Sequence, residues 1–291
     1  MPSWIIISLP SPKTNRVPDE AKLFACFSLY ADITDGRRSL ADWFRFAAEL
    51  GLDGADISVA HVTSRAVADL DALRQQAQDA GITVPVMVTY TDFTHPNADE
   101  RKRQCASLRL MIDDAARLGV SYLRVTAGQA HPGVTREDGI NWAVDGLISC
   151  LDHADEMGIV LVYENHTIGY GWTHYDFSQP ADIFLEIVRR TEGSGLRILF
   201  DTANPLARNE DPLMILDAVQ HRLGVVHIND LRQTGSFEPV VAGTGVSPIA
   251  AVIDRLHAIG YTGWVSLEEA SRTGEDGFRR AVPYVRGLLD N

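Results

Sequence analysis

Short apolar runs alternate with longer amphipathic stretches along nearly the whole chain. A short apolar run between turn signals is typical of a buried strand, and apolar residues at every third or fourth position are typical of a helix. The alternation predicts eight strand-then-helix units. The predicted strands cover residues 22–29, 54–59, 83–90, 121–126, 159–164, 196–201, 225–228 and 264–268, and the predicted helices cover residues 40–50, 64–80, 99–118, 136–157, 181–190, 211–221, 248–259 and 276–289.

A glycine closes many of these helices just before the next strand, where its tolerance of the left-handed conformation ends a helix. Strands rich in β-branched residues and leucine, each followed by a helix, indicate an all-parallel sheet. Eight such units are the number that closes into a barrel, and no glycine-rich phosphate turn of a doubly wound open sheet follows the first strand. We therefore expect an α/β fold, a single-domain (β/α)8 TIM barrel over residues 22–291 with a short N-terminal extension over residues 1–21.

Composition narrows the classes of partner. The chain has 291 residues and a net charge of −13, and such an acidic protein repels nucleic-acid phosphates and anionic membranes, so neither partner is expected. Three cysteines are too few for a disulfide framework, and no apolar run reaches the roughly 20 residues of a membrane span. We expect a cytoplasmic protein. The apolar residues 4–7 of the extension need cover, which favours a homo-oligomer, and a role as a subunit of a hetero-complex stays open.

Four strands in the second half of the chain each end in a residue that binds metals well: Glu164, Asp201, His227 and Glu268. They are separated by 37, 26 and 41 residues, enough for a loop, a helix and a return. In a parallel barrel the carboxyl ends of all strands meet at one face, where active sites are built. Three carboxylates and one imidazole there predict an oxygen-rich site for one divalent ion, and such a donor set suits several ions.

Such a site suits proton transfer next to a carbonyl group. Glu164 and Glu268 come from different strands, so they could approach a substrate from two sides and act as catalytic residues. Proton removal gives an enediolate whose charge the metal stabilises, and return of the proton completes an epimerisation or an isomerisation. His166 is a third catalytic candidate: it could be a general base, orient a metal ligand or bind substrate, or be a loop histidine without a role.

Residues of two long irregular loops are candidates for substrate binding. Arg232 could hold sugar hydroxyls, and a solvated loop arginine is the alternative. Trp172 and His174 lie in an aromatic stretch after the fifth strand that could form a lid stacking on a sugar, or could pack on a neighbouring loop.

Four motifs of the chain carry a family resemblance. They are Tyr163-Glu164-Asn165-His166, Phe200-Asp201-Thr202-Ala203-Asn204, Val226-His227-Ile228-Asn229-Asp230, and a tail from Gly243-Thr244-Gly245 through Gly260-Tyr261-Thr262-Gly263-Trp264 to Ser266-Leu267-Glu268-Glu269. With these motifs the chain resembles the sugar phosphate isomerase/epimerase family, the xylose isomerase-like TIM barrels, whose members include ketose 3-epimerases and inosose dehydratases. The resemblance implies a (β/α)8 barrel in which Glu164, Asp201, His227 and Glu268 bind one ion, Mn, Mg or Co, with Zn and Fe as alternatives. In the ketose 3-epimerases of this family the two glutamates also move the protons.

The chain departs from those epimerases at two positions that concern substrate handling. Asn204 stands where they often have a histidine, three residues after the aspartate ligand, and is a further candidate for substrate binding. Tyr170 stands where they often have another glutamate, six residues after the first glutamate ligand.

Three functions follow from these patterns. The first is a divalent-metal-dependent epimerase or isomerase of a small sugar or keto-sugar. The second is a metal-dependent lyase or dehydratase on a keto-sugar, an inosose or a C-glycoside, which shares the first proton abstraction and then eliminates a substituent. The third is a sugar-binding barrel subunit without catalysis. The related apurinic endonucleases need more metal-binding histidines, and an acidic chain suits DNA poorly.

Overall fold

A computed structural model describes residues 22–27 and 29–290, with residues 22–27 described by their backbone only. The predicted extension over residues 1–21 lies outside the described residues. The extension, its apolar residues 4–7 and the oligomer that they suggest therefore stay predictions. Among the described helices, none combines the length and the apolar character that crossing a membrane requires.

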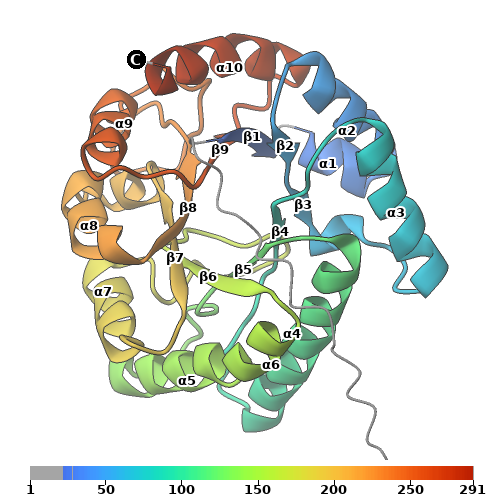
Figure 1. Cartoon of the computed structure of the whole chain (residues 1–291). Coiled ribbons are helices and arrows are strands. Elements are labelled where there is room, and N and C mark those ends of the chain that lie inside the picture. Colours follow the sequence, from blue (N-terminus) through green and yellow to red (C-terminus); the bar gives the residue numbers. More distant parts are fainter. Residues whose placement is uncertain (1–21, 28, 291) are drawn as a thin grey trace, which may run out of the picture.

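One parallel sheet of nine strands forms the centre of the described chain (Figure 1). Its strands follow one another in the order β2-β1-β9-β8-β7-β6-β5-β4-β3, and β2 and β3 are two pieces of one short segment. Because β2 pairs with β1 and β3 pairs with β4, that segment joins the two ends of the sheet and closes the barrel. The strands are β1 (Lys22–Phe27), β2 (Gly54–Ala55), β3 (Ile57–Ser58), β4 (Val86–Val88), β5 (Tyr122–Val125), β6 (Val160–Glu164), β7 (Arg197–Asp201), β8 (Leu223–Ile228) and β9 (Trp264–Glu269).

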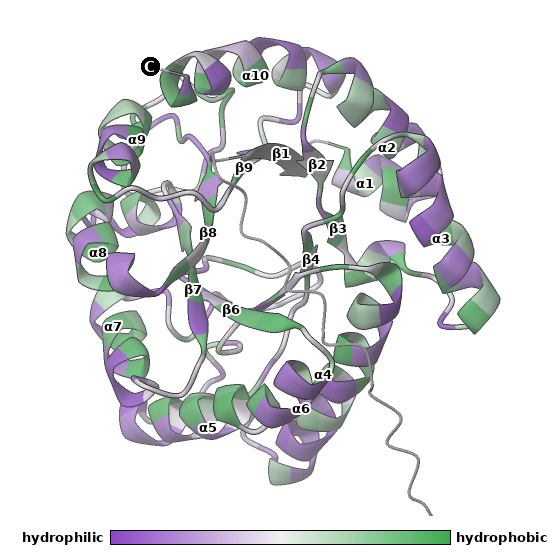
Figure 2. Cartoon of the chain, in the orientation of Figure 1, coloured by the Kyte–Doolittle hydropathy of each residue, from purple (hydrophilic) through white to green (hydrophobic). Residues whose placement is uncertain are grey.

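Helices surround the sheet as an outer ring (Figure 1). Most are amphipathic, with hydrophilic residues among the hydrophobic ones along the ring (Figure 2), and their apolar faces pack on the strands. The α-helices are α1 (Tyr30–Thr34), α2 (Leu40–Glu49), α3 (Val67–Asp79), α4 (Ala98–Leu118), α5 (Arg136–Ile148), α6 (Leu151–Glu156), α7 (Ala181–Arg190), α8 (Pro212–Val219), α9 (Ile249–Ala258) and α10 (Glu275–Leu289).

The (β/α)8 prediction is confirmed, and the predicted bounds differ most from the structure in three elements. The strand predicted over residues 54–59 is interrupted at Asp56, whose backbone carbonyl accepts a hydrogen bond from the indole of Trp43 at 3.1 Å. The strand predicted over residues 83–90 is regular only at Val86–Val88. The helix predicted over residues 136–157 divides into α5 and α6 because the Ser149 hydroxyl donates to the backbone of the preceding turn, which competes with continuation of the helix.

The barrel has two layers of apolar packing. A large cluster fills the space between the sheet and the helices. A smaller, separate cluster fills the inside of the barrel, with contributions from β4, β6, β7, β8 and β9. The barrel interior is therefore a packed core, and the inner layer consists of Val86, Val88, Val162, Leu199, Val225 and Trp264.

Candidate metal centre

The four predicted ligands lie at the carboxyl ends of neighbouring strands, directly beyond the inner core layer. Side chains of a strand alternate between its two faces, so a residue two or four positions after an inner core residue points to the same side. Glu164 follows Val162, Asp201 follows Leu199, His227 follows Val225, and Glu268 follows Trp264 in this way. The core of the barrel thus forms the floor on which the four polar side chains stand.

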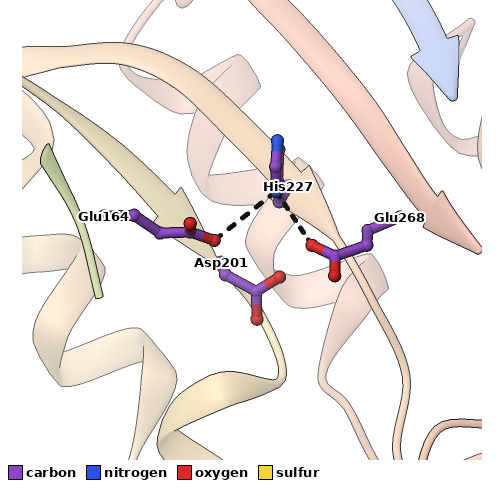
Figure 3. A group of neighbouring side chains, drawn as sticks. All are labelled: Glu164, Asp201, His227 and Glu268. Atoms are coloured by element: carbon purple, nitrogen blue, oxygen red, sulfur yellow. Dashed lines mark hydrogen bonds and ion pairs between the residues drawn. The ribbon is translucent and has the colours of Figure 1, made fainter. Parts of the chain in front are cut away.

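One ligand atom from each of the four side chains lies within 4.8 Å of the others, in a group that could hold a metal ion. The imidazole Nδ1 of His227 is 2.9 Å from Glu268 Oε2 and 3.5 Å from Glu164 Oε1. Figure 3 shows the two glutamates on opposite sides of His227, with Asp201 between them. Glu164, Asp201 and His227 are buried, whereas the Glu268 side chain is 15% exposed.

Hydrogen bonds hold Asp201 but leave one of its oxygens open. Its Oδ1 accepts from the backbone N–H groups of Ala203 and Asn204 at 2.8 and 2.7 Å. Its Oδ2 is buried without a hydrogen-bond partner, and so is Nε2 of His227. Buried polar atoms normally have a partner, so the open carboxylate oxygen in this cluster of ligands is what a cation site requires.

The charges of the cluster also favour a cation. Burial, Glu268 and Glu164 raise the pKa of Asp201 well above its usual range. Burial lowers the pKa of His227, but the two glutamates outweigh it and raise that pKa to about 10. Both shifts favour the protonated form of the group, because a proton reduces the negative charge of the three carboxylates. A divalent ion would replace these protons, and oxygen and imidazole donors suit such an ion.

Arg124 is a buried partner of the cluster whose pairing was not predicted. Its Nε lies 3.1 Å from Glu164 Oε2, and both side chains are 2% exposed. Burial alone would raise the pKa of Glu164, but Arg124 and His227 lower it to about 2. The guanidinium also lies over the ring of Tyr90, 4.8 Å from its centroid. The available signal was a charged residue inside an otherwise apolar strand, which is rarely buried without a partner.

Asn165 fixes the positions of two ligands. Its side-chain amide donates to the backbone carbonyl of Asp201 at 3.0 Å, and its Oδ1 accepts from the backbone N–H of Asp201 at 2.7 Å. The residue directly after Glu164 thereby holds the end of β7 beside the end of β6. The polar sequence Tyr163-Glu164-Asn165-His166 contained this signal, but no role was assigned to the asparagine.

Three of the other predicted residues lie on the β6 or β7 side of the barrel mouth. His166 is buried, with its Nδ1 3.4 Å from Asp176 Oδ2, and its ring stands perpendicular to that of Trp172, with centroids 5.7 Å apart. Asn204 is buried, and its Oδ1 accepts a 2.7 Å hydrogen bond from the hydroxyl of Thr167. The substrate-binding roles of Trp172 and Asn204 and the catalytic role of His166 stay predictions.

Arg232 and His174 contact residues outside the group of four ligands. The Arg232 side chain is 68% exposed and pairs with Glu238 at 3.5 Å, because it lies on an irregular loop whose course the sequence pattern does not define. The ring of His174 lies against that of His131, with centroids 5.7 Å apart, and its backbone N–H donates to Gln129. The substrate-binding roles of Arg232 and His174 stay predictions.

Comparisons with known proteins agree with this fold. The chain matches the family model of the xylose isomerase-like TIM barrel over residues 44–288. It is 29% identical over 211 residues to the Streptomyces coelicolor protein named "Putative hydroxypyruvate isomerase". This alignment covers 69% of this chain and 74% of that protein. An inosose dehydratase of Lacticaseibacillus casei is 27% identical over 139 residues, or 42% of this chain and 44% of that protein.

Two solved structures show the same fold over almost their whole length. A D-psicose 3-epimerase, crystallised in the presence of D-fructose, superposes with a TM-score of 0.74 at 17% sequence identity. The superposition covers 93% of this chain and 100% of the epimerase chain. The IOLI protein with a bound zinc atom superposes with a TM-score of 0.73 at 18% sequence identity, over 92% of this chain and 96% of the IOLI chain. Together with the family model, these likenesses confirm the family that the motifs predicted: the chain belongs to the xylose isomerase-like TIM barrels.

Proposed function

We propose that this protein is a divalent-metal-dependent epimerase or isomerase of a small sugar or keto-sugar. The observation that carries the proposal is the placement of Glu164 and Glu268 on opposite sides of His227 in one largely buried cluster (Figure 3). Two carboxylates so placed can reach a substrate from two sides. The hydroxypyruvate isomerase and D-psicose 3-epimerase relatives support an enzyme of this class.

The chain's own residues account for the movement of the proton. One glutamate removes a proton from the carbon next to the carbonyl, and the other returns a proton to the opposite face or to the neighbouring carbon. Asn165 and the backbone N–H groups of Ala203 and Asn204 keep Asp201 in place. An ion held by Glu164, Asp201, His227 and Glu268 would polarise a carbonyl or hydroxyl oxygen of the substrate as a Lewis acid. Mn, Mg and Co suit this donor set, and Zn and Fe are alternatives.

A metal-dependent lyase or dehydratase is the second candidate, and the pair of His166 and Asp176 favours it. The buried Asp176 carboxylate lies 3.4 Å from the imidazole, and it can orient that ring for proton transfer. An elimination needs a proton donor for the departing hydroxyl group, and His166 would supply that proton. The inosose dehydratases among the relatives carry the corresponding activity in their names.

Solvent-exchange NMR tests the proposal. Metal-reconstituted protein is incubated in D2O with hydroxypyruvate, D-fructose, D-psicose and an inosose. Glu268→Gln serves as the inactive variant, and Glu137→Gln, at a 67% exposed glutamate of α5, is the matched control. We expect deuterium at the carbon next to the carbonyl of an epimerised or isomerised sugar, in wild type and Glu137→Gln only. Loss of water from the inosose would assign the dehydratase reaction. Metal-loaded protein that exchanges no proton and converts none of these compounds would refute the proposal.

A further inference from the structure

The loop between β6 and α7 has a stem that is fixed to its neighbour. The backbone N–H of Asp176 donates to the carbonyl of Thr167 at 2.8 Å and closes the stem. The backbone N–H groups of Thr173 and His174 donate to the side-chain oxygen of Gln129 at 2.9 and 3.2 Å. The base of the loop is therefore tied to the segment after β5, and residues 168–172 form its tip.

The tip reaches the opposite side of the barrel. The ring of Tyr170 lies on that of Tyr30, with centroids 4.9 Å apart and planes inclined by 50°. Tyr30 is the first residue of α1, the helix that follows β1, and Tyr170 lies in the loop that follows β6. In the closed sheet, β1 and β6 lie half the barrel apart, because four strand positions separate them in either direction. The contact between the two tyrosines therefore crosses the barrel mouth.

Tyr30 is a rigid support for this contact. Its ring is 7% exposed, and its hydroxyl is 3.0 Å from the hydroxyl of Ser58 at the end of β3. The ring of His61 lies 4.7 Å away from it. Tyr170, by contrast, is 53% exposed. An exposed aromatic side chain that rests on a fixed, buried one suits a contact that opens and closes.

The tip is also packed closely on a third side of the mouth. A Cβ atom added to Gly169 would lie 3.0 Å from the ring of Tyr90 and 2.7 Å from that of Trp172. Tyr90 follows β4, and Trp172 covers His166. The tip thus touches segments after β1 and β4, while the four candidate metal ligands stand at the ends of β6, β7, β8 and β9.

We propose that residues 168–172 roof the metal centre and that Tyr170, resting on Tyr30, is the latch that restricts the site to molecules small enough to be enclosed. This inference rests on the proposed metal site and specifies its substrates: single small sugars fit beneath such a roof, whereas the interior of a sugar chain does not. Tyr170 acts through enclosure and is a specificity-determining residue.

Removal of the bound metal by a chelator tests the roof. Manganese-loaded wild type, Tyr170→Ala and Tyr170→Phe are mixed with excess EDTA, and the loss of the ion is followed in time. Tyr175→Ala is the matched control, because Tyr175 is a similarly exposed tyrosine of the same loop, at 55%. An aromatic pair of ordinary strength predicts metal loss about 2- to 10-fold faster in Tyr170→Ala, with unchanged metal content before mixing, and wild-type rates in the other two variants. Equal rates in Tyr170→Ala and wild type would overturn the inference.

Hydrogen exchange separates failure of the roof from failure of the metal site. The N–H of Trp172 donates to the carbonyl of Gly169 at 3.1 Å, so its exchange reports opening of the tip whether or not metal is bound. If wild type takes up neither manganese nor Mg, Co, Zn or Fe, the proposed function fails, and exchange at residues 168–172 decides about the latch. Faster exchange in Tyr170→Ala than in Tyr175→Ala supports the latch, and equal exchange overturns it.

Discussion

Arg124 and Glu164 form an ion pair that is almost wholly removed from water, with Arg124 Nε 3.1 Å from Glu164 Oε2. The arginine comes from β5 and the glutamate from β6, the neighbouring strand. Charges in such surroundings are stable only with a partner. The pair therefore links the inner part of the barrel to one of the candidate metal ligands.

Replacing Arg124 by methionine should strongly destabilise the protein. The change leaves the Glu164 carboxylate buried without its partner, which typically costs about 3–5 kcal/mol. We expect the double variant Arg124→Met/Glu164→Gln to recover part of this loss, because both charges are then absent. Denaturant unfolding of metal-free protein measures both effects. Arg232→Gln, at an exposed arginine, is the control and should stay within about 0.5 kcal/mol of wild type. An Arg124→Met protein as stable as this control would refute the role of the pair.

The stability of the metal-free protein should fall as the pH rises above neutrality. Burial lowers the pKa of His227, but Glu164 and Glu268 outweigh this and raise it to about 10, compared with about 6.5 in an unfolded chain. The stabilisation is therefore complete below about pH 6.5 and is lost as the pH rises through 10. Over this range we expect a slope of about 1 kcal/mol per pH unit that His227→Asn lacks. Unfolding curves of the two proteins that stay parallel from pH 6 to 10 would contradict this assignment.

Metal binding should release protons. The imidazole of His227 must give up its proton in order to become a ligand, and Asp201, whose pKa is raised well above its usual range by burial, Glu268 and Glu164, adds to the release. We expect between about one and two protons per ion near neutral pH, and tighter binding as the pH rises toward 10. Calorimetry in buffers with different ionisation enthalpies counts the protons. Binding without proton release would show that the ion does not use these groups.

Gly245 should be hard to replace because it lies directly against Asp230 and Leu231, at the start of its own loop between β8 and α9. A Cβ atom there would meet the carbonyl oxygen of Leu231 and the carboxylate of Asp230 at 2.1 and 2.4 Å. The same carboxylate accepts from the N–H groups of Gly243 and Gly245 at 3.0 and 2.7 Å. Gly245→Ala should therefore cost at least about 2 kcal/mol of unfolding free energy. Gly287→Ala in α10, where an added Cβ atom would meet nothing within 4 Å, is the control and should be neutral or stabilising. Equal stability of both variants would refute the close approach.

The strand ends could be read from the sequence because inner core residues and ligands follow one period. Val162 and Glu164, or Leu199 and Asp201, share a face of their strand, so the pattern that predicts the barrel also brings the ligands together. The loops lack such a period. The exposed position of Arg232 depends on the course of an irregular segment, which local pattern does not determine.

Tertiary contacts also escaped the sequence analysis. The break between β2 and β3 at Asp56 involves a hydrogen bond from Trp43, 13 residues away. The pairing of Arg124 with Glu164 joins residues 40 positions apart. Both depend on which side chains the closed barrel brings together, and a single sequence specifies such contacts only through the complete fold.

Elemental analysis of the purified protein, after reconstitution with Mn, Mg, Co, Zn or Fe, tests the central claim most directly. Asp201→Ala and Glu164→Gln remove ligands, and Arg232→Gln is the control. We expect about one ion per chain in wild type and in Arg232→Gln, and a clear loss in the two ligand variants, each shown by circular dichroism to remain folded. Wild-type protein that retains none of these ions, or ligand variants that bind as much as wild type, would contradict the metal centre of Glu164, Asp201, His227 and Glu268.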